Sequence, residues 1–248
     1  MTDRILTALY WRDDPHEAPL FAAAVIGFIV LGVALTACAD DPPPSDVDRE
    51  AAPAALVRAA GAGDIEAVRR LLAEGADVDA RDASGRTAVT AAAMREHVDV
   101  VAALVDAGAD VDLQDTERNN PLLLAGENGN VALLREVLRA DPDLGATNRF
   151  GGVALIPASD RGHVEMVRAL LETDIPIDHV NDLGWTALLE AVILGDGGRA
   201  QQEIVALLVA AGADVSIPDR DGVTALQHAR DRGYAEIVRT LAAGPPPP

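Results

Sequence analysis

Apolar and polar residues follow one pattern that recurs along most of the chain. After a glycine turn near residue 85 comes a short alanine-rich run, then a polar turn at Glu96-His97, then a longer run with Val98, Val101 and Leu104 at helical spacing. A stripe of this kind indicates an amphipathic helix with one buried face. Each pattern therefore predicts a short helix and a longer helix. The small side chains of the short helix allow a neighbouring helix to approach closely.

The segments that join these helix pairs share a phrase. It reads GADVDARD at 75–82, GADVDLQD at 108–115 and GADVSIPD at 212–219, with degenerate copies DPDLGATN at 141–148 and DIPIDHVN at 174–181. The last residues of these segments lie 33, 33, 33 and 38 positions apart. A fixed period of this length is typical of stacked repeat proteins, whose single repeats are too small to bury their apolar faces alone. Six repeats can be counted, the first without its connecting loop and the last truncated.

The repeated motifs resemble those of the ankyrin repeat. Its Thr-Pro-Leu-His box corresponds to TAVT at 87–90, NPLL at 120–123, VALI at 153–156, TALL at 186–189 and TALQ at 224–227. The Gly-His turn between helices survives as Gly162-His163, and the second helix begins with DIEAV, HVEMV, QEIVA or AEIVR. The resemblance covers residues 50–243. It implies an all-α solenoid of about six helix-turn-helix repeats with short β-hairpin loops.

Repeats 3 and 4 depart most from this pattern. Arg118 stands at the turn-glycine position, Pro142 interrupts the usual Gly-Ala, Val153 replaces the capping threonine and Pro157 lies within a predicted helix. We expect local opening of the stack to begin around residues 141–160.

Repeat 5 is five residues longer than the period, and the extra residues fall near Gly195–Gln202. Its glycines predict a flexible loop between the two helices. Such a loop is either a tolerated surface insertion or a specificity loop for a partner.

The N-terminal segment predicts a membrane attachment. Residues 20–37 are uniformly apolar, and Leu35-Thr36-Ala37-Cys38 resembles a bacterial lipobox, so residues 1–38 would be a lipoprotein signal with Cys38 as the lipidated residue. Because the leader is long and acidic, an uncleaved membrane helix is the alternative, and an apolar stretch of about 18 residues just suffices to span a bilayer. Arginines precede this stretch and acidic residues follow it, which predicts repeats outside the cytoplasm, periplasmic or on the cell surface. An acidic, proline-rich linker at 39–49 and a proline-rich disordered tail at 244–248 flank the repeats.

The formal net charge of −20 limits the classes of partner. Nucleic-acid binding needs a cationic surface that displaces counterions, and an anionic membrane surface would repel the chain. The charge favours a protein partner with a basic surface, or serves only to keep the solenoid soluble.

No motif for catalysis is present. The chain lacks a Gly-x-Ser-x-Gly elbow, a Walker loop and paired cysteines, and His97 and His163 stand at the inter-helix turn of the repeat. The aspartates of DVDARD and DVDLQD lack the glycine and terminal glutamate of a calcium loop, so we interpret them as turn formers. We expect no enzymatic activity, cofactor or metal.

The resemblance to ankyrin repeats implies that a partner protein binds the hairpin tips and the exposed face of the first helices. Phe150 and Trp185 stand out because aromatic residues are few, although Trp185 is equally suited to packing over its hairpin. The predicted partner-binding residues are Arg118, Asn119, Arg149, Phe150, Leu183, Trp185 and Arg220. We expect a monomeric interaction scaffold. The alternatives are an immunity or inhibitor protein that blocks a toxin or enzyme, and an accessory factor of an exported oxidative-stress enzyme.

Overall fold

The computed structural model describes the backbone of residues 46–244 and the side chains from Ala54 onward. The apolar stretch 20–37, Cys38 and the tail 245–248 lie outside the described residues, as does most of the linker at 39–49. Among the described residues, no helix combines the length and apolarity needed to cross a membrane.

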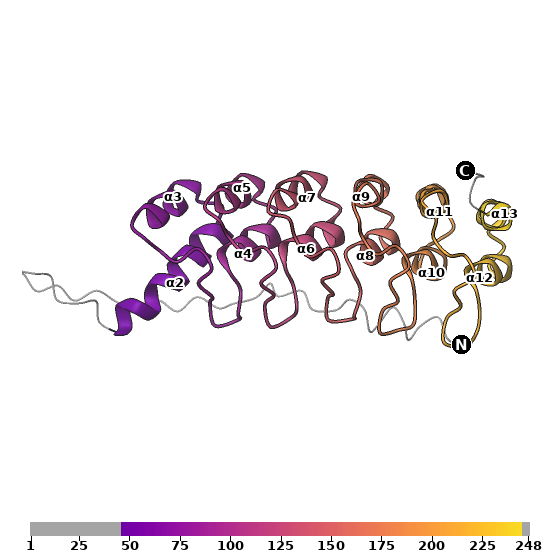
Figure 1. Ribbon diagram of the computed structural model, residues 1–248, viewed down its shortest axis with the longest axis horizontal. Coiled ribbons are helices and arrows are strands. Elements are labelled where there is room, and N and C mark those ends of the chain that lie inside the picture. Colours follow the sequence, from indigo (N-terminus) through magenta and orange to yellow (C-terminus); the bar gives the residue numbers. More distant parts are fainter. Residues whose placement is uncertain (1–45, 245–248) are drawn as a thin grey trace, which may run out of the picture. The chain divides into compact units, whose positions relative to one another are not determined.

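Six pairs of helices make up the described part of the chain. They are α2 (Asp46–Gly61) with α3 (Ile65–Ala73), α4 (Ala88–Met94) with α5 (Val98–Asp106), α6 (Pro121–Asn128) with α7 (Val131–Leu138), α8 (Leu155–Asp160) with α9 (Val164–Leu170), α10 (Ala187–Ile193) with α11 (Arg199–Ala210), and α12 (Ala225–Asp231) with α13 (Ala235–Ala243). The first helices form one row and the second helices a parallel row above it (Figure 1). The prediction of an all-α solenoid with six repeats is confirmed.

The core lies between the two rows and repeats with the period of the sequence. The second helices contribute large residues, among them Leu104, Leu170 and Leu208, none of which is exposed. The first helices contribute a fully buried alanine at one register position from repeat 2 to repeat 6, at Ala92, Ala125, Ala158, Ala191 and Ala229. Adjacent first helices approach so closely that a Cβ on Gly126 would lie 2.5 Å from the Ala154 carbonyl oxygen. The small residues thus set the spacing between repeats.

The connecting loops are held by side chains rather than by β-strands. The last residue of each repeated phrase accepts hydrogen bonds through Oδ1 from the backbone N–H groups two and four residues later, at 2.8–3.0 Å. These residues are Asp82, Asp115, Asn148, Asn181 and Asp219. The expectation of β-hairpins was therefore too strong, because the described loops contain one isolated bridge, Pro218 to Thr224, and no strand.

Other aspartates of the phrase couple neighbouring repeats. Asp79 Oδ1 accepts from Asp110 N at 2.8 Å, and Asp112 Oδ1 accepts from Asp143 N at 2.9 Å. Asp110 Oδ1 in turn accepts from Asp112 N at 2.9 Å. The interpretation of these aspartates as turn formers is confirmed, and they also link one loop to the next.

The inter-helix turns stack on one another through glycine and histidine. A Cβ on Gly63 would lie 2.8 Å from the His97 ring, and a Cβ on Gly129 would lie 2.6 Å from the His163 ring. His163 Nε2 is also 3.1 Å from the carbonyl oxygen of Glu127. Both histidines are part of the scaffold, as their position in the repeat indicated.

The insertion in repeat 5 forms a loop between α10 and α11, as expected, and part of it is helical. Part of Gly195–Gln202 extends α11 to 12 residues, against seven to nine in the other described second helices. Tyr234 of repeat 6 donates a hydrogen bond from Oη to the Gly195 carbonyl oxygen at 3.0 Å. A Cβ on Gly197 would lie 2.4 Å from the Tyr234 ring, so glycine is needed for close packing.

Repeat 4 contains the shortest described first helix, α8, with six residues and no side-chain cap. The other loop-to-helix junctions are capped by Thr87, Asn120, Thr186 and Thr224. Pro157 lies in the first turn of α8, where a backbone N–H would have no partner within the helix, so it costs little. The early opening of residues 141–160 stays a prediction.

Asp141 provides a test of backbone strain in repeat 3. Its φ is +51°, at the register of Gly108 and Gly212, which have φ of +86° and +95°. We expect Asp141→Gly to raise the free energy of unfolding by about 0.5–1 kcal/mol, because glycine adopts this left-handed conformation without steric penalty. Urea denaturation measures the change. Asp141→Ala keeps a Cβ and is the control, and an equal gain in that variant would contradict the explanation.

Candidate protein-binding surfaces

The predicted partner-binding residues all lie on four successive loop tips, 115–119, 148–152, 181–185 and 219–223, which we call the tip surface. Three of them are exposed arginines, Arg118, Arg149 and Arg220. The other four are half-buried, Asn119, Phe150, Leu183 and Trp185.

The tips of repeats 3 and 4 form one cluster. Arg149 pairs with Glu117 at 2.9 Å, and its guanidinium carbon lies 4.9 Å from the centroid of the Phe150 ring. Arg118 donates from Nη2 to Thr147 Oγ1 at 2.6 Å. The structure thus places Arg149 over the Phe150 ring and ties Arg118 to Thr147, in the part of the loop just before them.

The remaining predicted residues serve the loops themselves. Trp185 packs against the core, which supports the packing interpretation of this residue. Asn119 Nδ2 donates to Asp115 Oδ2 at 3.2 Å, and Arg220 donates to the carbonyl oxygen of Asp182. Leu183 donates its backbone N–H to Asn181 Oδ1 at 3.0 Å. Their roles in binding stay predictions.

A buried polar pair fixes the tip that carries Trp185. Glu190 on α10 is fully buried and accepts a hydrogen bond through Oε1 from Asn181 Nδ2 at 2.7 Å, while Oε2 has no partner. Burial, reinforced by the nearby Asp160 carboxyl, raises the pKa of Glu190 to about 8 against the hydrogen bond from Asn181. Glu190 is therefore mostly a neutral acid at pH 7.

Repeat 6 has an equivalent pair of different chemistry. His228 on α12 contacts Asp219 at 2.7 Å between Nε2 and Oδ2, and the separation along the chain is nine residues, as between Asn181 and Glu190. In both repeats a first-helix side chain holds the residue that organises the loop tip.

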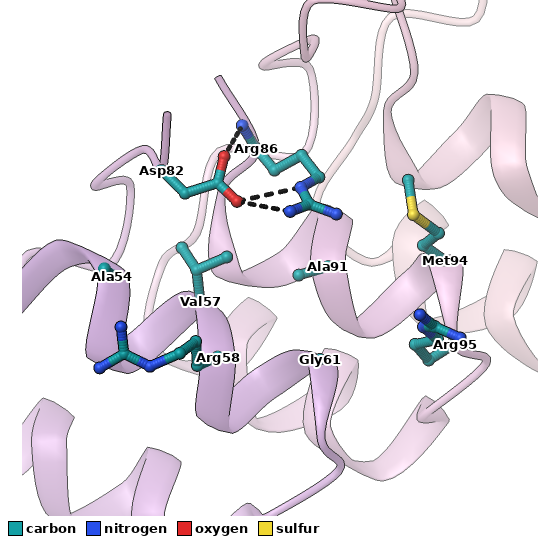
Figure 2. A pocket seen from close by; sticks show the side chains of 9 residues that line it. All are labelled: Ala54, Val57, Arg58, Gly61, Asp82, Arg86, Ala91, Met94 and Arg95. Atoms are coloured by element: carbon teal, nitrogen blue, oxygen red, sulfur yellow. Dashed lines mark hydrogen bonds and ion pairs between the residues drawn. The ribbon is translucent and has the colours of Figure 1, made fainter. Parts of the chain in front are cut away.

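The corresponding space in repeat 2 is open. The same register position holds Ala91, and a groove of about 230 Å³ lies between α2, α4 and the loop at 82–86 (Figure 2). Its lining residues are Ala54, Val57, Arg58, Gly61, Asp82, Arg86, Ala91, Met94 and Arg95. Asp82 is bound instead by Arg86, whose Nε and Nη2 donate to Oδ2 at 3.0 and 2.8 Å.

The groove carries positive charge. Burial alone would raise the pKa of Asp82, but hydrogen bonds from Arg86 and Ser84 outweigh it and lower that pKa, so the Asp82–Arg86 pair is ionised and neutral overall. Arg58 on α2 and Arg95 on α4 are exposed, and neither forms an ion pair within the described part of the chain.

A model of ankyrin repeats in three copies matches residues 56–148 and 122–219. The chain belongs to the ankyrin repeat family. The crystal structure of an ankyrin repeat domain from Acinetobacter baumannii is 47% identical, covers 76% of this chain and 96% of its own, and superposes with a TM-score of 0.74. The ankyrin repeat protein EF0377 is 42% identical over 77% of this chain and 97% of its own, also with a TM-score of 0.74.

A curated relative is the ankyrin repeat protein YahD of Escherichia coli strain K12. It is 49% identical over 55 residues, which are 22% of this chain and 27% of YahD. Ankyrin repeats generally mediate protein–protein interaction, and nothing in these comparisons indicates catalysis. Among the side chains that the structure describes, from Ala54 to Gly244, no three His, Cys, Asp or Glu are placed to hold a metal ion.

Sequence reasoning missed both Glu190 and the groove. The signal for Glu190 is an acidic residue within the otherwise apolar ALLEAVI of α10. The signal for the groove is the alignment of the repeats, in which Ala91 occupies the position that holds the larger polar residues Glu190 and His228 in repeats 5 and 6.

Glu190 should make the stack less stable at alkaline pH. Its pKa is 4.5 when unfolded and about 8 when folded, so its contribution is complete below pH 4.5 and is lost as the pH rises toward 8. We expect Glu190→Gln, which keeps the bond from Asn181 and does not ionise, to gain stability relative to wild type by about 1.4 kcal/mol per pH unit over this range. Urea denaturation at several pH values measures the difference.

The exposed Glu172 supplies the control for this measurement. Glu172→Gln should differ from wild type by the same small amount at every pH. If the free energies of unfolding of wild type and Glu190→Gln fell in parallel as the pH rose, Glu190 would be ionised in the folded protein.

Proposed function

We propose that this ankyrin repeat protein is a non-enzymatic scaffold that binds a partner protein through the tip surface and the face of its first helices. The observation that carries the proposal is the cluster of Arg118, Arg149 and Phe150. Their loops are fixed by the hydrogen bonds of Asp115 and Asn148, and the arginine side chains are held by Glu117 and Thr147 before a partner arrives. Arginine and aromatic residues dominate binding energy at protein interfaces, and a preorganised surface loses less entropy on binding.

The proposal places the repeats outside the cytoplasm, tethered to the membrane by the N-terminal segment. The apolar residues 20–37, the lipobox-like sequence ending at Cys38 and the acidic linker support this topology. The formal charge of −20 favours a partner with a basic surface, since opposite charge raises the rate of association.

The tip surface is tested by alanine substitution at Arg118, Arg149 and Phe150 together. Partners are crosslinked in intact cells, identified by mass spectrometry and then quantified by pull-down. We expect recovery of the partner to fall about tenfold or more, because interface arginine and aromatic residues are typical hot spots. Trp185 is left unchanged because it packs against the core.

The matched control replaces two exposed arginines on second helices, Arg135 and Arg199, by alanine. It should leave recovery unchanged. Unchanged recovery in the folded triple variant, judged by circular dichroism, would refute binding through this cluster.

Mass spectrometry of the membrane fraction tests the anchor. We expect the mature N-terminus to be Cys38 with a diacylglyceryl thioether, and Cys38→Ser to lose both the lipid and the processing. An intact peptide from residues 1–37 in the membrane fraction would identify the uncleaved helix instead. Wild-type protein found only in the soluble fraction would contradict both forms of attachment.

A further inference from the structure

The groove between α2 and α4 arises from one register position on the first helices. That position holds Arg58, Ala91, Leu124, Pro157, Glu190 and His228 in repeats 1 to 6. Glu190 and His228 reach the loop residue of their own repeat, whereas the Ala91 methyl group stops short of Asp82, and a groove lies there. The groove lies between the first helices of repeats 1 and 2, beside the small residue Ala91.

The size and lining of the groove suit one side chain of a peptide. Its volume of about 230 Å³ is below the roughly 300–1,000 Å³ typical of small-molecule pockets. Val57, Ala91 and Met94 give it an apolar part, and methionine adapts its shape to different partners. Figure 2 shows Arg58 on the α2 side and Arg95 on the α4 side of this apolar part.

The local charge of the groove is opposite to that of the whole chain. Of its lining residues only Asp82 is acidic, and Arg86 neutralises it, which leaves Arg58 and Arg95 uncompensated among the described residues. At physiological ionic strength charges are screened beyond about 8 Å, so a short segment in the groove senses these arginines more than the remote acidic residues.

We propose that the groove binds a linear acidic segment of a partner protein, with one apolar side chain between Val57, Ala91 and Met94 and with carboxylates flanking it on Arg58 and Arg95. This rests on the proposed function and adds the chemistry of the partner to it. Guanidinium groups pair with carboxylates in bidentate geometry, and an extended segment can place an apolar residue between two acidic ones.

The test measures the binding of a fluorescein-labelled peptide by fluorescence anisotropy. The peptide has one leucine flanked on each side by aspartate and glutamate, and the protein is the chain from residue 39 to residue 248. We expect saturable binding that weakens with added salt. The same peptide with asparagine and glutamine in place of its acids should bind about tenfold more weakly, since two ion pairs are lost.

Two variants separate the two parts of the site. Arg58→Gln with Arg95→Gln should weaken the acidic peptide about tenfold, while Arg135→Gln with Arg199→Gln, the same change of charge on second helices, should have no effect. Ala91→Leu fills the groove with a residue that the same position already holds in repeat 3, and should also abolish saturable binding.

Equal affinity for the acidic and neutral peptides, or no loss in the Arg58 and Arg95 variant, would overturn the proposal. Binding that appears only after Asp40 and Asp41 are changed to asparagine would also overturn it, because the chain's own acidic linker would then be the occupant. These outcomes are independent of the tip-surface pull-down, so loss of the groove site and loss of the scaffold function can be told apart.

Discussion

The whole stack depends on one kind of hydrogen bond, from backbone N–H groups at a loop tip to the side-chain oxygen of an aspartate or asparagine. The arms of each loop exchange few backbone bonds, such as that from Asp115 N to the Asn119 carbonyl oxygen at 3.0 Å, and other N–H groups at the tip are bound by a side chain. One oxygen of Asp115, for example, accepts from two N–H groups at once, at 2.9 and 2.8 Å. Because an aspartate or asparagine recurs at this position in each loop and accepts the same two bonds, the tips share one backbone arrangement. The first helices therefore start at equivalent points, and their alanines meet at equivalent depths.

A second set of bonds turns separate loops into a continuous surface. Asp79 and Asp112 accept from the backbone of the next repeat, and Asp182 N donates to the Phe150 carbonyl oxygen at 2.9 Å. Repeat proteins are stabilised by such nearest-neighbour interfaces rather than by contacts distant in sequence. Binding residues on one tip are consequently held in register with those on the next, which is what a surface spread over several repeats requires.

The period of the sequence was enough to predict the helices, the loop tips and the positions of Arg118, Arg149 and Phe150 on them. The side-chain contacts of individual residues could not be predicted from this period. The glycines of Gly195–Gln202 indicated flexibility, and the sequence did not show that Gly197 packs against Tyr234, a residue 37 positions away. Glu190 looked like one helical residue among others, because its burial depends on how the neighbouring helices pack around α10 and its partner Asn181 lies in the preceding loop. The β-hairpins were expected from the resemblance alone. The aspartate side chains bind backbone N–H groups that strand pairing would use, and the period of the sequence does not indicate this.

The register position shared by Ala91, Glu190 and His228 has a consequence for how this surface can evolve. Glu190 and His228 contact the loop residue of their own repeat, and Ala91 lines the groove beside Asp82, so a substitution at this position changes one local feature and leaves the spacing alanines in place. A small residue opens a recess, an acid inserts a carboxyl group that is neutral at pH 7, and a histidine places a ring nitrogen against the loop aspartate. The residues at this position along the row of first helices can therefore change one at a time without changing the packing of the repeats. Recognition can therefore diverge by single substitutions while the architecture stays the same.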